Sequence, residues 1–114
     1  MYATQPAHEI AGKMFRFKWI DGPTRGKVYE HIFHVDGNVE WRDAALPREQ
    51  QPSATKEKVP YAAQRINESI YVISYRSLTG HTLTAVLNFQ NNKLTAFASN
   101  SATWLPVQGT FEVI

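Results

Sequence analysis

The sequence predicts an all-β protein, a single antiparallel up-and-down barrel of about eight strands. Stretches in which apolar and polar residues alternate recur along the chain, turn residues separate them, and no stretch has a sustained helical period. A closed barrel follows because closure removes the unpaired strand edges that an open sheet of this length would expose. The 114 residues suffice for one core, and we expect residues 1–11 to form a tail and residues 12–114 to form the barrel domain.

The N-terminal half contains three expected strands. Residues 12–19 alternate aromatic with basic and other side chains, and the strand ends at the turn residues 21–23 (Asp-Gly-Pro). Residues 27–35 and 39–42 form a hairpin around Asp36-Gly37, because an Asp-Gly pair accommodates the positive φ of a tight turn.

The longest predicted loop runs from Ala44 to Thr55. It is polar and contains two prolines, which cannot donate to a sheet ladder. Such a loop is either a solvated excursion or a lid over the barrel mouth.

The C-terminal half begins with strands at residues 58–67, 70–77 and 81–89. The polar turn 90–93 then leads into a strand at 94–97, which completes a hairpin. Within it Leu87 lies on the apolar face and Thr84 on the opposite, mixed face, because successive side chains of a strand alternate.

The last segments are predicted as two separate pieces. Residues 103–106 look like a strand that Pro106 confines to an edge or a bend, and residues 109–114 form a short final strand. If the strand face of Phe17 points into the barrel, the corresponding faces of the other strands predict which residues point inward. This inner set is Phe15, Phe17, Trp19, Tyr29, His31, Phe33, Trp41, Tyr71, Tyr75, Ser77, Leu83, Ala85 and Leu87.

Several strand and turn residues resemble a known family. Gly12–Trp19 (GKMFRFKW), Tyr29-Glu30, Val39–Arg42 (VEWR), and Ile70–Tyr75 (IYVISY) followed by Thr79-Gly80 resemble the small calycin-type, lipocalin-like barrels of the MoaF-like group. The resemblance covers roughly residues 12–97. It implies a calycin-like barrel and an association with molybdenum-cofactor operons, and it implies no defined activity.

The same framework is similar to bacterial phenolic acid decarboxylases, but the residues that this second resemblance implies for catalysis are not matched. Phe17 and Trp19 stand where that family has two tyrosines that hold a substrate carboxylate. Ser77 stands where it has an acidic glutamate, and a serine has no usable proton at neutral pH. Decarboxylation by that mechanism is therefore not expected.

The aromatic inner set allows two interpretations. The rings either fill the core of a structural or interaction domain, or they line a lumen pocket in which polar tips orient a small neutral ligand that is apolar or planar. For the second interpretation the predicted ligand-binding residues are Phe17, Trp19, Tyr29, His31, Trp41, Tyr71, Tyr75, Ser77 and Leu83. An enzyme on the same barrel is a further alternative. His31 or a lumen tyrosine would act as acid or base for a decarboxylase-, isomerase- or hydratase-like step on a small aromatic or enolisable substrate. The sequence has no paired carboxylates that would support such a step.

No motif points to a metal or a cofactor, and we expect neither. His31 and His34 are three residues apart in a strand, which puts their rings on opposite faces. The chain lacks cysteine, a phosphate-binding glycine loop and a dinucleotide fingerprint.

Charge and hydropathy bear on partners and compartment. The net charge is +2, the basic residues are scattered, and in the first strand the rings face away from Arg16 and Lys18, so we expect no nucleic-acid binding. No apolar stretch is long enough to span a bilayer and no leader-like start is present, so a cytoplasmic protein without membrane contact is expected. A homodimer that pairs through residues 94–114 is the favoured oligomeric state.

Overall fold

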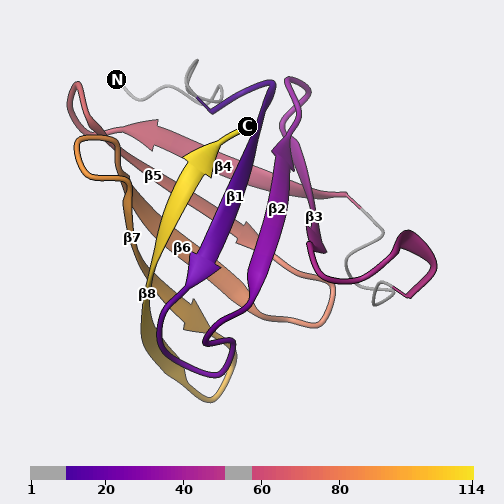
Figure 1. Ribbon diagram of the computed structural model, residues 1–114. Helices are drawn as coiled ribbons and strands as arrows, with labels where there is room; N and C mark the ends of the chain where they lie inside the picture. Colours follow the sequence, from indigo (N-terminus) through magenta and orange to yellow (C-terminus); the bar gives the residue numbers. More distant parts are fainter. Residues whose placement is uncertain (1–9, 51–57) are drawn as a thin grey trace.

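Strands β1 to β8 run up and down in chain order around a closed barrel (Figure 1). The computed structural model describes residues 10–50 and 58–114. Within them the strands are β1 Lys13–Trp19, β2 Val28–Phe33, β3 Asn38–Asp43, β4 Val59–Arg65, β5 Ile70–Arg76, β6 Thr82–Asn88, β7 Lys93–Ser99 and β8 Trp104–Val113. A short 3-10 turn, η1 Arg48–Gln50, follows β3. Every neighbouring pair is antiparallel, and β1 pairs with β8 to close the barrel, which confirms the predicted fold class.

The predicted alternation of faces is present along the strands. In β1 the rings of Phe15 and Phe17 are fully buried, whereas Lys18 is exposed. In β6 Leu87 is fully buried, whereas the neighbouring Val86 is exposed. The apolar face of each strand therefore lines the barrel interior.

Two of the predicted turns contain residues that readily adopt the positive φ found there. Gly37 has a φ of +92°, and the carboxylate of Asp36 accepts a hydrogen bond from the backbone N–H of Asn38 at 3.0 Å. In the β6–β7 turn Asn92 has a φ of +57°, a conformation that asparagine tolerates better than most residues. These local preferences help to set the register of both hairpins.

The C-terminal segments form one continuous strand, β8, so the expected separation into two pieces is wrong. Residues 104–108 pair with β7 alone, residues 109 and 110 pair with both β7 and β1, and residues 111–113 pair with β1. The backbone N–H and C=O of Gln108 point toward Asp21 and Ile20 on the β1 side. By the two-residue period Pro106 also presents its nitrogen on that side, beyond the end of β1, so the missing N–H interrupts no ladder bond.

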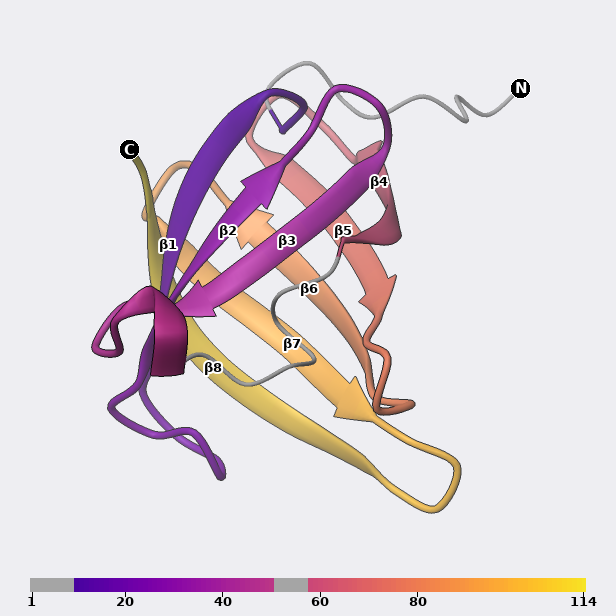
Figure 2. The same ribbon diagram turned by 90° about the vertical axis from the view of Figure 1, so that its right-hand side faces the viewer.

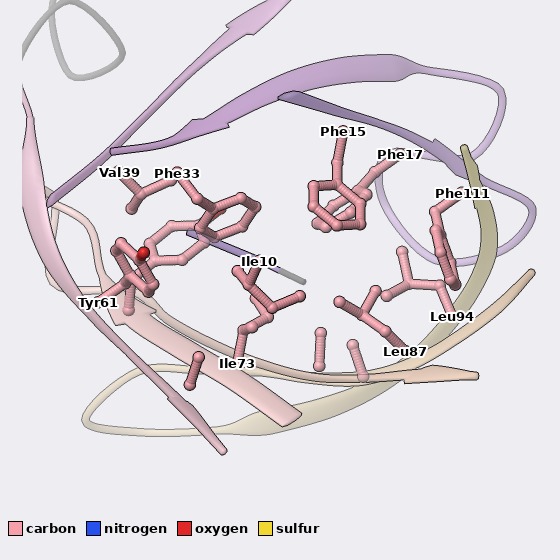
Figure 3. Close-up of a cluster of buried hydrophobic side chains, with 14 of the residues drawn as sticks. Ile10, Phe15, Phe17, Phe33, Val39, Tyr61, Ile73, Leu87, Leu94 and Phe111 are labelled. Atoms are coloured by element: carbon pink, nitrogen blue, oxygen red, sulfur yellow. The ribbon is translucent and has the colours of Figure 1, made fainter. Parts of the chain in front are cut away.

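One half of the interior is filled with side chains (Figure 3). Phe15 packs edge-on against Phe33 with ring centroids 5.5 Å apart, and Phe89 and Phe111 pack in the same way at 5.0 Å. Ile10, which precedes β1 and was expected in the tail, is fully buried in this cluster. The filled half lies at the end where β1, β3, β5 and β7 begin.

At the opposite end the wall between β3 and β4 is incomplete within the described residues. Only Asn38 and Val39 of β3 pair with β4, because β4 begins at the partner of Val39 and does not lie beside the rest of β3 (Figure 2). Trp41 and Asp43 therefore lie on a part of β3 that has β2 as its strand neighbour. No helix in the described part of the chain is long and apolar enough to cross a membrane.

Candidate functional site

A cavity of about 510 Å³, the mouth cavity, lies at the end of the barrel where β1, β3, β5 and β7 finish and β2, β6 and β8 start. This is the lower end of the barrel in Figure 1. Seven of the nine predicted ligand-binding residues line it: Trp19, Tyr29, His31, Trp41, Tyr75, Ser77 and Leu83. The barrel is thus packed with side chains at one end and hollow at the other.

A hydrogen-bonded pair of buried side chains forms part of the inner wall of the mouth cavity. The Nε2 atom of His31 on β2 lies 2.7 Å from the hydroxyl oxygen of Tyr75 on β5, across the barrel. Phe17 packs against the imidazole with ring centroids 4.3 Å apart, and Trp41 packs against the Tyr75 ring at 4.8 Å. These contacts hold both polar tips in a largely aromatic setting.

Both members of this pair are neutral at physiological pH. Burial lowers the pKa of His31 to about 3, and the backbone of Tyr29 opposes this shift by favouring a proton on the ring. Burial also raises the pKa of Tyr75 well above its ordinary value. A neutral imidazole has one donor and one acceptor nitrogen, so either the Tyr75 hydroxyl donates to Nε2 or the Nε2–H group donates to the Tyr75 oxygen, and Nδ1 is buried without a hydrogen-bond partner among the described residues.

The charged side chains at the rim neutralise each other. Lys27 lies 3.3 Å from Asp43, and the side chain of Asp43 is only 8% exposed, against 54% for Lys27. Tyr29 lies beside them, and burial raises the pKa of its hydroxyl above the ordinary value while Lys27 opposes the shift. The site therefore carries an ion pair at its edge and no net charge from that pair.

A second polar group lies on the β5–β6 connection. The hydroxyls of Ser77 and Thr79 are 2.8 Å apart, and Nδ1 of His81 lies 3.2 Å from the Thr79 hydroxyl. Thr79 therefore stands between the serine and the histidine, so Ser77 lacks the directly bonded base that nucleophilic catalysis requires.

The remaining two predicted site residues lie elsewhere. Phe17 is fully buried beneath His31, and Tyr71 is buried at the filled end, where its ring packs edge-on against Phe89 at 5.4 Å. Neither lines the mouth cavity. The predicted lid falls partly on residues 51–55, which lie outside the described residues, and Leu46 at its start lines the cavity.

Sequence reasoning missed several residues that line the cavity. Lys27 shares a strand face with Tyr29 and His31, and Asp43 shares one with Trp41, so the two-residue period was a sufficient signal for both. Leu105 and Val107 were missed because β8 was expected to break at Pro106. Thr79 and His81 belong to a turn, and turns have no period from which a direction could be read.

Among the described residues, no three His, Cys, Asp or Glu side chains come together in a metal-binding arrangement. His31 lies inside the barrel, whereas His34 contacts Glu40 at 2.8 Å, in agreement with the opposite faces predicted for the two rings.

Comparison with known proteins identifies the family. A similar solved structure is that of a Burkholderia vietnamiensis protein provisionally named a beta-lactamase, with a TM-score of 0.74 and 18% sequence identity, covering 97% of this chain and 100% of that one. At this identity the likeness shows the fold alone. No curated protein matches the sequence. Residues 11–112 match the MoaF-like family, which is nearly the whole barrel, and the chain therefore belongs to the MoaF-like family.

Proposed function

We propose that this MoaF-like barrel binds a neutral, planar or largely apolar small molecule in the mouth cavity. The observation that carries the proposal is the cavity itself, about 510 Å³ of space bounded by the rings of Trp19, Trp41 and Tyr75. Binding sites for small ligands commonly have volumes of about 300–1,000 Å³, with mostly apolar walls and a few polar groups. A barrel packed along its whole length would offer no such space.

Charge supports a neutral ligand. The cation at the rim, Lys27, is already paired with Asp43, and the inner pair His31–Tyr75 is uncharged. A carboxylate placed among the rings would lose its hydration without gaining an unpaired positive partner, which is costly.

The enzyme alternative has less support. Acid–base catalysis near neutral pH works best with a group whose pKa lies close to that pH. The pKa of His31 is lowered to about 3 by burial, and that of Tyr75 is raised by burial, so neither group exchanges its proton readily at pH 7. Binding without chemistry is therefore the function that we favour.

The test compares two probes of the same shape, naphthalene-2-carboxamide and naphthalene-2-carboxylate. Tryptophan emission is measured in a Trp104→Phe background, because Trp104 is 74% exposed and does not line the cavity, which leaves Trp19 and Trp41 as reporters. We expect the neutral amide to change the emission and to bind at least roughly tenfold more tightly than the carboxylate.

Trp19→Ala should weaken amide binding roughly tenfold while the barrel still unfolds cooperatively, because a large contact surface is lost. In the wild-type background Trp104→Ala, measured by calorimetry, is the matched control and should leave the affinity unchanged. If neutral probes change neither emission nor melting temperature, lumen binding is ruled out and the function lies on the outer surface.

A further inference from the structure

The mouth cavity has a polar rim on the side of the β5–β6 connection. The inward faces of β5 and β6 continue one step beyond the paired Tyr75 and Leu83, to Ser77 and His81, where the Ser77 N–H donates to the His81 carbonyl at 2.7 Å. Both side chains line the cavity. Because two residues of a strand span about 7 Å, Ser77 and His81 lie about that far toward the mouth from the aromatic inner wall.

Three polar side chains at this rim, Ser77, Thr79 and His81, are joined by two hydrogen bonds, and we call them the rim triad. Thr79 is the middle member, because its hydroxyl contacts Ser77 Oγ at 2.8 Å and His81 Nδ1 at 3.2 Å. With a neutral imidazole the three groups have three protons to donate, and the two bonds use two of them. One proton therefore stays available to a ligand, whichever way the two bonds point and whichever imidazole nitrogen carries its proton.

The two ends of the rim triad keep hydrogen-bonding capacity. Within the described residues Thr79 is the side-chain partner of both Ser77 and His81, and Nε2 of His81 has no partner. In every arrangement of the protons the triad thus offers one donor and at least one acceptor. On the other side of the rim Lys27 and Asp43 are already paired with each other at 3.3 Å. The rim triad is therefore the better partner for a neutral polar group.

We infer that the rim triad binds the polar end of the ligand, and that this end is a neutral group with both a hydrogen-bond donor and an acceptor, such as a primary amide or a hydroxyl. The inference rests on the proposed function, and it adds the orientation of the ligand, with its apolar part at the inner wall and its polar end at the rim. The separation of about 7 Å between these two levels is close to the length of two fused aromatic rings.

The test compares two probes of nearly the same shape, naphthalene-2-carboxamide and 2-isopropenylnaphthalene, titrated by calorimetry at pH 8. The second probe has carbon in place of the amide oxygen and nitrogen, so it measures the apolar contacts alone. Ser77→Ala and His81→Phe each remove one end of the rim triad, and each should weaken amide binding roughly fivefold, about the effect of one hydrogen bond. Both variants should bind 2-isopropenylnaphthalene within about twofold of the wild-type affinity.

Thr84→Val is the matched control, because Thr84 and Ser74 form a hydroxyl pair at 3.0 Å between the same two strands but outside the cavity. This variant should bind both probes with the wild-type affinity. NMR of the wild type provides a second measurement that needs no substitution. The amide should shift the imidazole resonances of His81 and should leave unchanged those of His34, which contacts Glu40 away from the cavity.

The outcomes separate the inference from the function on which it rests. Wild-type amide affinity in Ser77→Ala and His81→Phe, or His81 resonances that do not shift, would overturn the role of the rim triad while leaving a binding cavity in place. An equal loss of affinity for both probes in the two variants would also overturn it, because the loss would then not come from hydrogen bonding. If neither probe binds to the wild type, the proposed function and the role of the rim triad are both overturned.

Discussion

At the scale of single residues, His31 is an ionisable side chain buried almost completely among aromatic rings. It is 2% exposed, and its ring contacts are Phe17, Phe33, Trp41 and Tyr75. A protonated imidazole in this setting has no carboxylate among those contacts, which is why burial lowers its pKa to about 3.

This shift predicts a loss of stability in mild acid. Between about pH 6.5 and pH 3 the unfolded chain binds a proton on His31 that the folded chain does not, so the free energy of unfolding falls as the pH falls through this range. We expect a loss of about 2 kcal/mol between pH 7 and pH 5, seen as a lower urea midpoint. His31→Leu should flatten this part of the profile, and a slope equal to that of the wild type would show that His31 binds its proton at the same pH in the folded barrel as in the unfolded chain.

Glu30 contributes to the pH dependence of stability in a more acidic range than His31. Arg42 and Arg16 hold the pKa of its carboxyl below the ordinary value by hydrogen bonding, so its stabilisation is lost only as the pH falls below about 4.5. The two effects are therefore separable by the pH at which each begins.

At the scale of elements, the two faces of β6 differ in how much their side chains contribute to the free energy of unfolding. Leu87 is fully buried, whereas Thr84 is half-buried on the outer face and its hydroxyl contacts that of Ser74 at 3.0 Å. Leu87→Ala should cost about 2–5 kcal/mol because it leaves a cavity, and Thr84→Ala about 1 kcal/mol or less. Urea unfolding measures both, and equal losses would mean that the two faces are assigned the wrong way round.

The β1–β8 closure depends on a close approach at Gly109, which lies opposite Trp19. A methyl group at Gly109 would clash with the carbonyl oxygen of Lys18, a backbone atom that can move only with its strand. Gly109→Ala should therefore destabilise the barrel by about 1–3 kcal/mol in urea unfolding. Thr110→Ala, at the exposed neighbouring position, is the control. An unchanged urea midpoint in Gly109→Ala would mean that β1 and β8 can move apart at this point without loss of stability.

At the scale of the whole molecule, one side of the outer surface carries ion pairs and another carries exposed apolar side chains. On the β1–β3 side Arg16 contacts Glu30 and Glu112 at 3.1 and 2.6 Å, and Arg42 contacts Glu30 at 2.7 Å. On the β6–β8 side the outward residues include Val86, Phe97 and Trp104, of which Phe97 is 50% and Trp104 74% exposed. Exposed apolar side chains of this kind can be covered when two copies meet in a symmetric pair.

The homodimer through residues 94–114 stays a prediction, and this surface is where we expect it. Light scattering should give twice the 13.0 kDa of one chain, and Phe97→Glu should shift the protein toward the monomer. Ile66→Glu is the matched control, because Ile66 is also exposed but lies in the β4–β5 connection. A concentration-independent species of 13.0 kDa would contradict the dimer.

The sequence by itself determined strands β1 to β7, the turns between several of them and the alternation of inward and outward side chains. Alternation in β1, the Asp36-Gly37 turn and the Asn-rich β6–β7 turn are local features, and each is readable from a few adjacent residues. Recognition of the family rested on the same strand and turn residues, which is why it predicted the fold and implied no defined activity.

Only the tertiary structure decided how deep along the barrel each inward side chain lies. A period of two residues distinguishes inside from outside, but the position along the barrel axis depends on the stagger between strands far apart in sequence, such as the pairing of Trp19 with Gly109. For that reason Phe17 and Tyr71 could not be separated in advance from Trp19 and Tyr75, although the first two lie in packed parts of the barrel and the last two line the mouth cavity.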